Sequence, residues 1–257
     1  AIWKGLVGSE MCIRDRNANS LITALHVARE LTDEYDEEDI LVIFDLDNTL
    51  LTMNTEFGSN SWWEWQSELS KKDADTCIPE RVPNRLDVQG AAFYASSMSQ
   101  TQPDVTSIVR QLQDEEFRVM VLTARGSQYR LSTFRELRRN NLDFSKHAIP
   151  MDDDTNFRGL TFFPSSDSRA VLYEDGVFMV SGQHKGKMLR ALLERLDWEP
   201  DAVVMMDDSG ENIENMRTSM GLMNIPYRLY RYTRMDEKAN NFDKDEAYRQ
   251  WQQAAPA

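Results

Sequence analysis

Short apolar runs that alternate with amphipathic stretches are the main pattern of this chain. Three runs, at 40–44, 117–122 and 202–206, are almost wholly apolar and have the length of buried strands. A further strand is expected at about 227–232. Because such strands, separated by helices, are typical of a parallel sheet that is covered on both faces, the pattern predicts a doubly wound α/β fold with a Rossmann-like core.

Helical periodicity fills the intervals between these strands. The first helix is expected from Leu21 to about Tyr35, with Ser20 as its N-cap. The other helices are expected at about 87–97, 104–114, 127–140, 185–196 and 211–219, with a polar helix at the C-terminus.

Two segments interrupt this alternation. Residues 54–100 are predicted to form a small helical cap insertion that divides an α/β core made of residues 17–53 and 101–257. Residues 145–182 contain several short strand-like runs and predict a β-rich insertion within that core. Its Glu174–Gly176 turn has the composition of a β-hairpin.

Residues 1–16 are set apart from the fold. The stretch Leu6–Arg16 resembles the translation of a DNA-sequencing adapter, so the segment is excluded from the fold prediction. The native N-terminus is therefore expected to be missing. Cys77 is then the one remaining cysteine, which fits either redox compartment, and the location stays open between bacterial periplasm and cytoplasm, with export favoured.

The overall charge narrows the range of partners. A net charge of -14 repels phosphate backbones, so no nucleic-acid partner is expected. No apolar run reaches the length of a membrane span. The sequence does not define an oligomeric state.

Polar residues follow three of the predicted strands. Asp45 and Asp47 come after the first, Thr123 after the second, and Asp207 and Asp208 after the third. In open α/β sheets ligands bind at the carboxyl ends of the strands. Two carboxylates held close together repel each other, so this edge of the sheet is predicted to hold a cation, a nucleophile or both.

Together with Lys185 and Gly186 at a predicted helix start, these residues resemble the four motifs of the haloacid dehalogenase superfamily of phosphotransferases. The resemblance extends over about residues 40–233. Within it, three segments are similar to an uncharacterised bacterial branch, a domain family of unknown function: Phe57–Gln66, Gly182–Gly186 and Tyr230–Thr233.

The resemblance implies a Mg²⁺-dependent phosphohydrolase that acts on a small phosphorylated substrate. Asp45 would attack phosphorus and form an aspartyl-phosphate, and Asp47 would be the general acid and base. Mg²⁺ would be held by Asp45, the backbone carbonyl of Asp47, and Asp208. Asp207 would bind the ion through water or hold Lys185.

The resemblance also implies a phosphoryl-binding set. Thr123 would donate a hydrogen bond, with help from a backbone amide near Asn48, and Ala124 and Arg125 would adjoin the substrate. Arg125 has a second interpretation, in which it pairs with a surface carboxylate. Lys185 would place its ammonium between the nucleophile and the phosphoryl group.

Several alternatives remain open at this point. Lys187 competes with Lys185, which is preferred because Gly186 follows it. Trp62, Trp63 and Trp65 either line the mouth of the pocket or pack in the cap. A phosphomutase or another phosphotransferase would use the same residues, and a phospho-ligand binding protein would share the fold. A dehalogenase is disfavoured because it has no use for the proton that Asp47 would donate.

Overall fold

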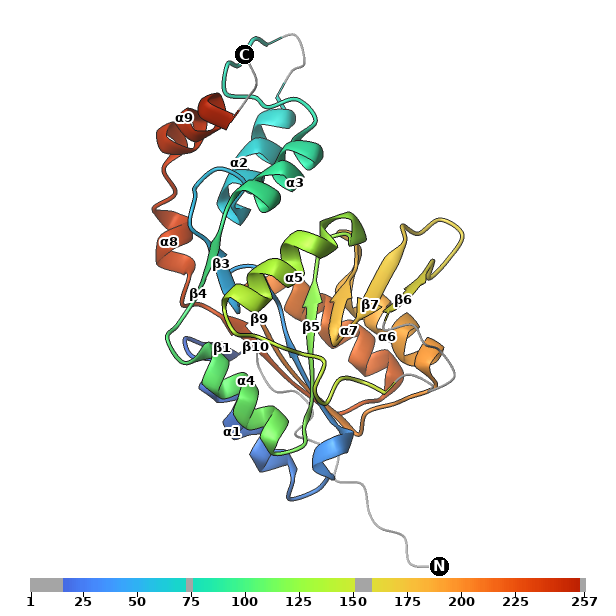
Figure 1. The fold of residues 1–257 in the computed structure, drawn as a ribbon. Helices are drawn as coiled ribbons and strands as arrows, with labels where there is room; N and C mark the ends of the chain where they lie inside the picture. The colour runs from blue at the N-terminus through green and yellow to red at the C-terminus, as the bar shows by residue number, and fades with distance from the viewer. Residues whose placement is uncertain (1–15, 73–75, 151–158, 255–257) are drawn as a thin grey trace, which may run out of the picture.

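The computed structural model describes residues 16–72, 76–150 and 159–254 (Figure 1). Within these residues eight strands form one sheet, with the order β1-β10-β9-β2-β5-β8-β7-β6. The strands are β1 (Arg16–Ala18), β2 (Ile40–Phe44), β5 (Arg118–Thr123), β6 (Gly159–Phe162), β7 (Val171–Glu174), β8 (Val177–Met179), β9 (Ala202–Asp207) and β10 (Tyr227–Tyr232). Neighbouring strands are parallel along the first six places of this order, which are β1, β10, β9, β2, β5 and β8. Strand β7 is antiparallel to both of its neighbours, β8 and β6.

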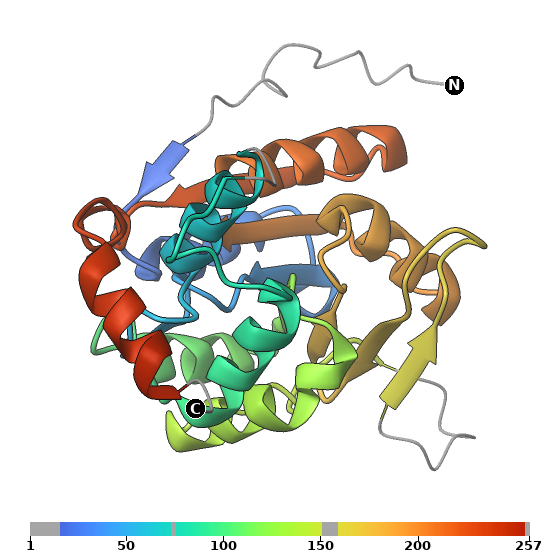
Figure 2. The same ribbon diagram turned by 90° about the horizontal axis from the view of Figure 1, so that it is seen from above.

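Helices cover both faces of the sheet. Figure 2 shows the green helices α4 and α5 on one side and the orange helices α6 and α7 on the other. The core helices are α1 (Ile22–Leu31), α4 (Val105–Asp114), α5 (Arg130–Arg139), α6 (Lys185–Leu196) and α7 (Gly210–Met223), with short 3-10 turns at Glu37–Asp39 and Ser127–Tyr129. The predicted doubly wound α/β fold is therefore confirmed.

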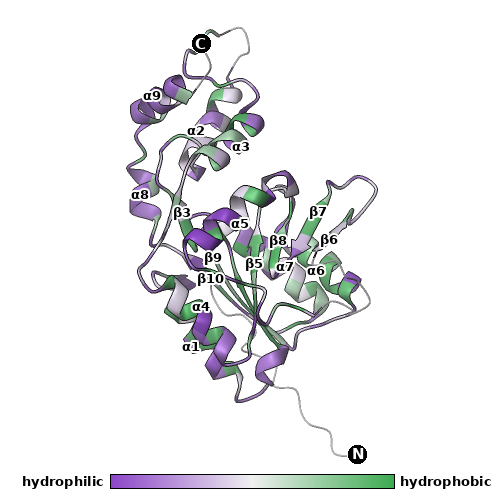
Figure 3. Ribbon diagram, viewed as in Figure 1, coloured by the Kyte–Doolittle hydropathy of each residue, from purple (hydrophilic) through white to green (hydrophobic). Residues whose placement is uncertain are grey.

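The central strand β2 explains why both faces are covered. Its residues are all buried, and they alternate between two hydrophobic clusters. Val42 and Phe44 belong to the cluster under α1 and α4, while Leu41 and Ile43 belong to the cluster under α6 and α7. Figure 3 shows this pattern as hydrophobic strands between helices that turn their hydrophilic side outward. A strand that is apolar on both sides can only be stable between two helical layers.

The region between β2 and α4 forms a separate layer above the sheet edge (Figure 1). Helices α2 (Asn60–Ser70) and α3 (Arg85–Ala95) lie between the antiparallel strands β3 (Leu51–Met53) and β4 (Met98–Gln100). The apolar side chains of α2 belong to the same hydrophobic cluster as the residues under α1 and α4. We call α2, α3, β3 and β4 the cap.

The C-terminal helices α8 (Asp236–Asn240) and α9 (Lys244–Ala254) pack against the cap (Figure 1). The Trp251 ring lies 5.6 Å from the Phe57 ring, and the Gln250 side chain accepts a hydrogen bond from the Phe57 amide. Lys238 donates to the hydroxyl of Thr52 and to the carbonyl of Met53. The sequence predicted a polar C-terminal helix but no contact between it and the cap.

The predicted hairpin is present. Asp175 and Gly176 connect β7 to β8 and both have positive φ, 44° and 75°. A Cβ at Gly176 would lie 2.1 Å from the carbonyl oxygen of Phe144, so only glycine fits there. These strands join the main sheet instead of forming a separate unit, and the part of the predicted β-rich insertion at 151–158 lies outside the described residues.

Two details of the sequence prediction were wrong. Ser20 is not the N-cap of α1, because Leu21 holds that position and its amide donates to Gln102. The helix also ends at Leu31, before the acidic turn. Arg16, the last residue of the adapter-like segment, pairs with Tyr230 in the edge strand β1, while residues 1–15 lie outside the described residues.

Candidate active site

The carboxyl ends of β2, β5 and β9 lie side by side at the sheet edge below the cap. Asp45 follows β2 directly, Thr123 ends β5 and Asp207 ends β9. Because β2 pairs in parallel with both β5 and β9, the polar residues after these strands meet at one edge. The structure thus brings together the residues that the sequence predicted to be neighbours.

Lys185 is the centre of this group. Its ammonium donates to a carboxylate oxygen of Asp45 and, at 2.7 Å, to one of Asp207. The lysine is only 1 % exposed. Burial by itself would lower the pKa of Lys185, but the charges of Asp207 and Asp45 and the hydrogen bonds to them raise it above its usual value. The ammonium therefore stays charged beside Asp45.

The start of α6 explains why Lys185, and not Lys187, reaches this position. Lys185 is the first residue of the helix and points to the sheet edge, whereas Lys187 is exposed. Gly186 lets α6 approach α7, because a Cβ there would lie 2.4 Å from the carbonyl oxygen of Asn215. His184 caps the helix by accepting a hydrogen bond from the Lys187 amide.

The two aspartates after β9 have different surroundings. Both oxygens of Asp207 are engaged, one by Lys185 and the other by the Ser209 amide at 2.9 Å and the Asn212 side chain at 3.0 Å. Asp208 is partly exposed, and its amide donates to Thr49. Asp207 therefore holds Lys185, and Asp208 has the freer carboxylate.

Arg125 makes an ion pair that the sequence did not predict. Its guanidinium donates two hydrogen bonds to Asp47, at 2.9 and 2.7 Å, and lies 3.9 Å from the centre of the Phe93 ring in the cap. It also donates to Thr133 and contacts Met98. Arg125 is 5 % exposed, so its carboxylate partner is Asp47 at the site and not one on the surface.

The other predicted phosphoryl-binding residues have separate positions. The Thr123 hydroxyl is buried and accepts a hydrogen bond from the Arg125 amide, while Ala124 lines the cavity above the site. Asn48 has a left-handed backbone, with φ of 60°, and its amide donates to the Leu51 carbonyl. That amide is therefore already engaged. The Asn48 side chain instead accepts from Thr52, and it partly offsets the raised pKa of the Asp208 carboxyl.

Burial and like charges strongly affect the acids. Burial raises the pKa of Asp45 well above its usual value; the charge of Lys185 opposes this shift, and the carboxylates of Asp207 and Asp208 reinforce it. Burial and the charge of Asp207 raise the pKa of Asp208 to about 7. Negative charge at this edge is thus incompletely compensated by the protein.

The donor set fits a divalent cation. Oxygens of Asp45, Asp207 and Asp208 lie within 4.8 Å of one another. Among the described residues, the cations that pair with the carboxylates of these three aspartates and of Asp47 are Lys185 and Arg125. Because both oxygens of Asp207 are engaged, Asp45 and Asp208 have the carboxylates that are open to an ion. Hard oxygen ligands of this kind suit Mg²⁺, and its two charges would offset the excess.

A cavity of about 710 Å³ opens above these residues. Its floor includes Asp45, Asp47 and Lys185, and its other walls come from the starts of α2, α7 and α8. Trp63 lines it, with the guanidinium of Arg85 stacked 4.5 Å from its ring centre. Trp62 and Trp65 are instead buried in the cap, so the three tryptophans divide between the two predicted roles.

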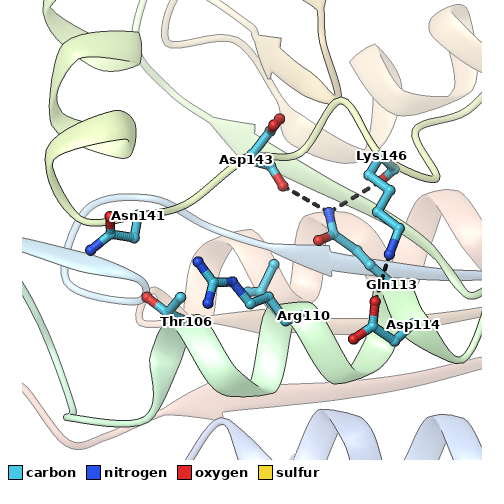
Figure 4. A pocket seen from close by; sticks show the side chains of 8 residues that line it. Thr106, Arg110, Gln113, Asp114, Asn141, Asp143 and Lys146 are labelled. Carbon is cyan, nitrogen blue, oxygen red and sulfur yellow. Dashed lines mark hydrogen bonds and ion pairs between the residues drawn. The ribbon is translucent and has the colours of Figure 1, made fainter.

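A second hollow, of about 360 Å³, lies away from this edge, between α4 and the segment after α5 (Figure 4). Its polar groups largely satisfy one another. Lys146 pairs with Asp114, and the Gln113 side chain donates to the carbonyls of Asp143 and Lys146. This hollow shares no residue with the cavity over Asp45.

Sheet and site together define a doubly wound α/β protein, with paired aspartates after one strand and a buried lysine beside them. The chain belongs to the family described as a protein of unknown function, DUF2608, which matches residues 23–255. The membership in a family of unknown function that the motifs predicted is confirmed.

Known proteins similar to this chain carry two kinds of name. A Chlamydia trachomatis protein named "Putative outer membrane protein" is 24% identical over 206 residues, which are 77% of this chain and 71% of the relative. A haloacid dehalogenase-like hydrolase from Streptococcus pneumoniae has a TM-score of 0.41 and 13% identity, over 74% of this chain and 83% of that one. The haloacid dehalogenase domain of the effector Lem4 from Legionella pneumophila has a TM-score of 0.39 and 12% identity, over 84% and 95%.

No helix within the described ranges has both the length and the apolar character that crossing a bilayer requires.

Proposed function

We propose that this protein is a Mg²⁺-dependent phosphohydrolase that transfers the phosphoryl group of a phosphate monoester first to Asp45 and then to water. The observation that carries the proposal is the buried Lys185 ammonium between Asp45 and Asp207, at the floor of an open cavity. A cation fixed beside a carboxylate orients that carboxylate and stabilises the negative charge of an incoming phosphoryl group.

The first step would be nucleophilic. An oxygen of Asp45 attacks phosphorus, the bond from phosphorus to the ester oxygen breaks, and Asp47 protonates that oxygen, so that the alcohol leaves. Arg125 would keep the Asp47 carboxylate in place through its paired hydrogen bonds. In the second step Asp47 removes a proton from water, which attacks the aspartyl-phosphate and releases inorganic phosphate.

The residues that would hold Mg²⁺ are Asp45, Asp208 and the backbone carbonyl of Asp47. The ion would supply positive charge that keeps Asp45 ionised next to a phosphate dianion. Asn48 would orient Asp208, and Asn212 would orient Asp207. Thr123 would donate its hydroxyl hydrogen to a phosphoryl oxygen while its oxygen accepts from the Arg125 amide.

Hydrolysis of p-nitrophenyl phosphate, with Mg²⁺ and with EDTA, tests the proposal. We expect turnover that requires Mg²⁺ and falls by at least about 10⁴-fold in Asp45→Asn, because removal of a covalent nucleophile has effects of this size. Turnover that survives this substitution would refute the nucleophile. No turnover of any phosphate monoester in a broad panel would refute the function.

A further inference from the structure

The cavity carries an excess of negative charge that the proposed reaction does not explain. Six carboxylates line it, against the two cations Lys185 and Arg231. Lys185 is paired with Asp45 and Asp207. Arg231 is also engaged, since it donates to Asp236 at 2.7 Å and to the Asp208 carbonyl at 3.2 Å. The charge of each of these two cations is therefore already offset by a carboxylate of the described chain.

Two of these carboxylates, Glu64 and Glu211, stand apart from the reacting groups. Glu64 lies on cap helix α2 and Glu211 in the first turn of α7, and both are exposed. Within the described residues neither side chain has a hydrogen bond or an ion pair. Both line the same cavity as Asp45 and Lys185, and neither has a role in the proposed reaction.

Helix ends do not reverse this charge pattern. The starts of α2 and α7 line the cavity, and each helix start carries about half a positive charge. Glu211 offsets the start of α7, and Glu64 lies one turn into α2. The remaining lining side chains at these starts are neutral, and the polar ones suit hydroxyl groups: Asn60, Ser61, Trp63, Ser209 and Asn212.

The size of the cavity makes these charges effective. A volume of about 710 Å³ corresponds to a width of about 9 Å, close to the screening length of about 8 Å at physiological ionic strength. Because both glutamates line a cavity of this size, their charges are only partly screened from an alcohol part bound in it.

Building on the proposed function, we infer that the cavity selects phosphate monoesters whose alcohol part carries a positive charge, and disfavours those with a second anionic group. Glu64 and Glu211 are the residues that determine this preference. The substrate class is thus the phosphate ester of an amino alcohol or of an aminated sugar.

Three small esters of similar size test the inference on the purified full chain with Mg²⁺. They are choline phosphate, its uncharged carbon isostere 3,3-dimethylbutyl phosphate, and 3-carboxypropyl phosphate. We expect kcat/KM to fall in this order, by about tenfold from the cation to its neutral isostere, as two carboxylates at partly screened distances predict. The ratio should shrink at 1 M salt, where the screening length is about 3 Å.

Substitutions locate the effect. Glu64→Gln and Glu211→Gln should each reduce the preference about threefold, and the double variant should remove it. Glu68→Gln is the matched control, because Glu68 is exposed on the same helix but does not line the cavity. It should leave the ratio unchanged.

Hydrolysis of p-nitrophenyl phosphate distinguishes a failure of the inferred charge selectivity from a failure of the proposed phosphohydrolase function. If Mg²⁺-dependent turnover is present but the charged and neutral esters react equally, or if Glu68→Gln changes the ratio as much as Glu64→Gln, the selectivity is refuted and the phosphohydrolase function stands. If turnover is absent with every ester, the function itself fails.

Discussion

The two walls of the cavity are built in opposite ways. On the sheet side, Lys185 and Asp207 are almost fully buried and their hydrogen bonds are satisfied. On the cap side, Glu64 is exposed and unpaired in the described chain. Buried ion pairs fix geometry but tolerate little change, whereas solvated charges can vary at small cost to stability. From this contrast we infer that the buried residues on the sheet side define the reaction, and that the exposed residues of the cavity, Glu64 on the cap and Glu211 on α7, define the substrate.

On the sheet side of the cavity, Lys185→Met is expected to have the largest effect. We expect activity to fall by about 10³-fold, because the group that stabilises the phosphoryl charge is lost. Stability should fall by about 3–5 kcal/mol, since Asp45 and Asp207 lose their buried partner. Steady-state kinetics and chemical denaturation measure the two effects.

The matched control is Lys187→Met, one half-turn along α6. Lys187 is exposed, so its loss should change activity less than about twofold and stability by less than about 0.5 kcal/mol. Equal losses in both variants would contradict the central place of Lys185.

Arg125 connects the two walls, because it pairs with Asp47 and stacks on Phe93 of the cap. Arg125→Gln should lower kcat by about 10²-fold with little change in KM, since a misplaced catalytic group reduces turnover more than binding. Arg125→Lys should recover only part of the loss, because lysine cannot form the paired hydrogen bonds. A rise in KM alone would show instead that Arg125 binds substrate.

How far the sequence could predict this site depends on the kind of contact. The strand ends were predictable, because apolar runs locate strands and parallel strands bring their carboxyl ends together. Lys185 was preferred to Lys187 because Gly186 follows it, as the resemblance to the haloacid dehalogenase superfamily implies. The pair between Arg125 and Asp47 was not, since these residues are 78 positions apart and no periodicity relates them. The packing of α9 on the cap was hidden for the same reason, because a polar helix gives no signal of its partner.

Removal of Mg²⁺ should affect stability in a pH-dependent way. The pKa of Asp208 is about 7 in the folded chain, above its usual value of 3.8, so the folded state binds more protons between these two pH values. Without metal, stability should therefore be greatest below about pH 4 for this group and fall as pH rises towards 7 and above. The raised pKa of Asp45 acts in the same direction.

Bound Mg²⁺ requires ionised carboxylates, so it should stabilise the protein more at pH 8 than at pH 5. At a free concentration of one hundred times its Kd, the ion would add about 2.7 kcal/mol to the free energy of unfolding. This corresponds to a rise in Tm of about 5–10 °C for a chain of this size. Calorimetry with Mg²⁺ and with EDTA at both pH values measures this difference. Asp208→Asn should greatly reduce it; an equal shift at both pH values in the native protein would argue against these ligands.

The smallest expected effect concerns the cap wall. Trp251→Ala removes the ring that packs on Phe57, and it should lower stability by about 1–2 kcal/mol, because the ring is only partly buried. KM should rise severalfold while kcat changes little, since α2 loses support but the reacting groups stay in place. Trp198→Ala is the control, because Trp198 is also partly buried but packs on the opposite face of the sheet. It should lower stability without raising KM; if both variants raise KM equally, the cap wall has no separate role in substrate binding.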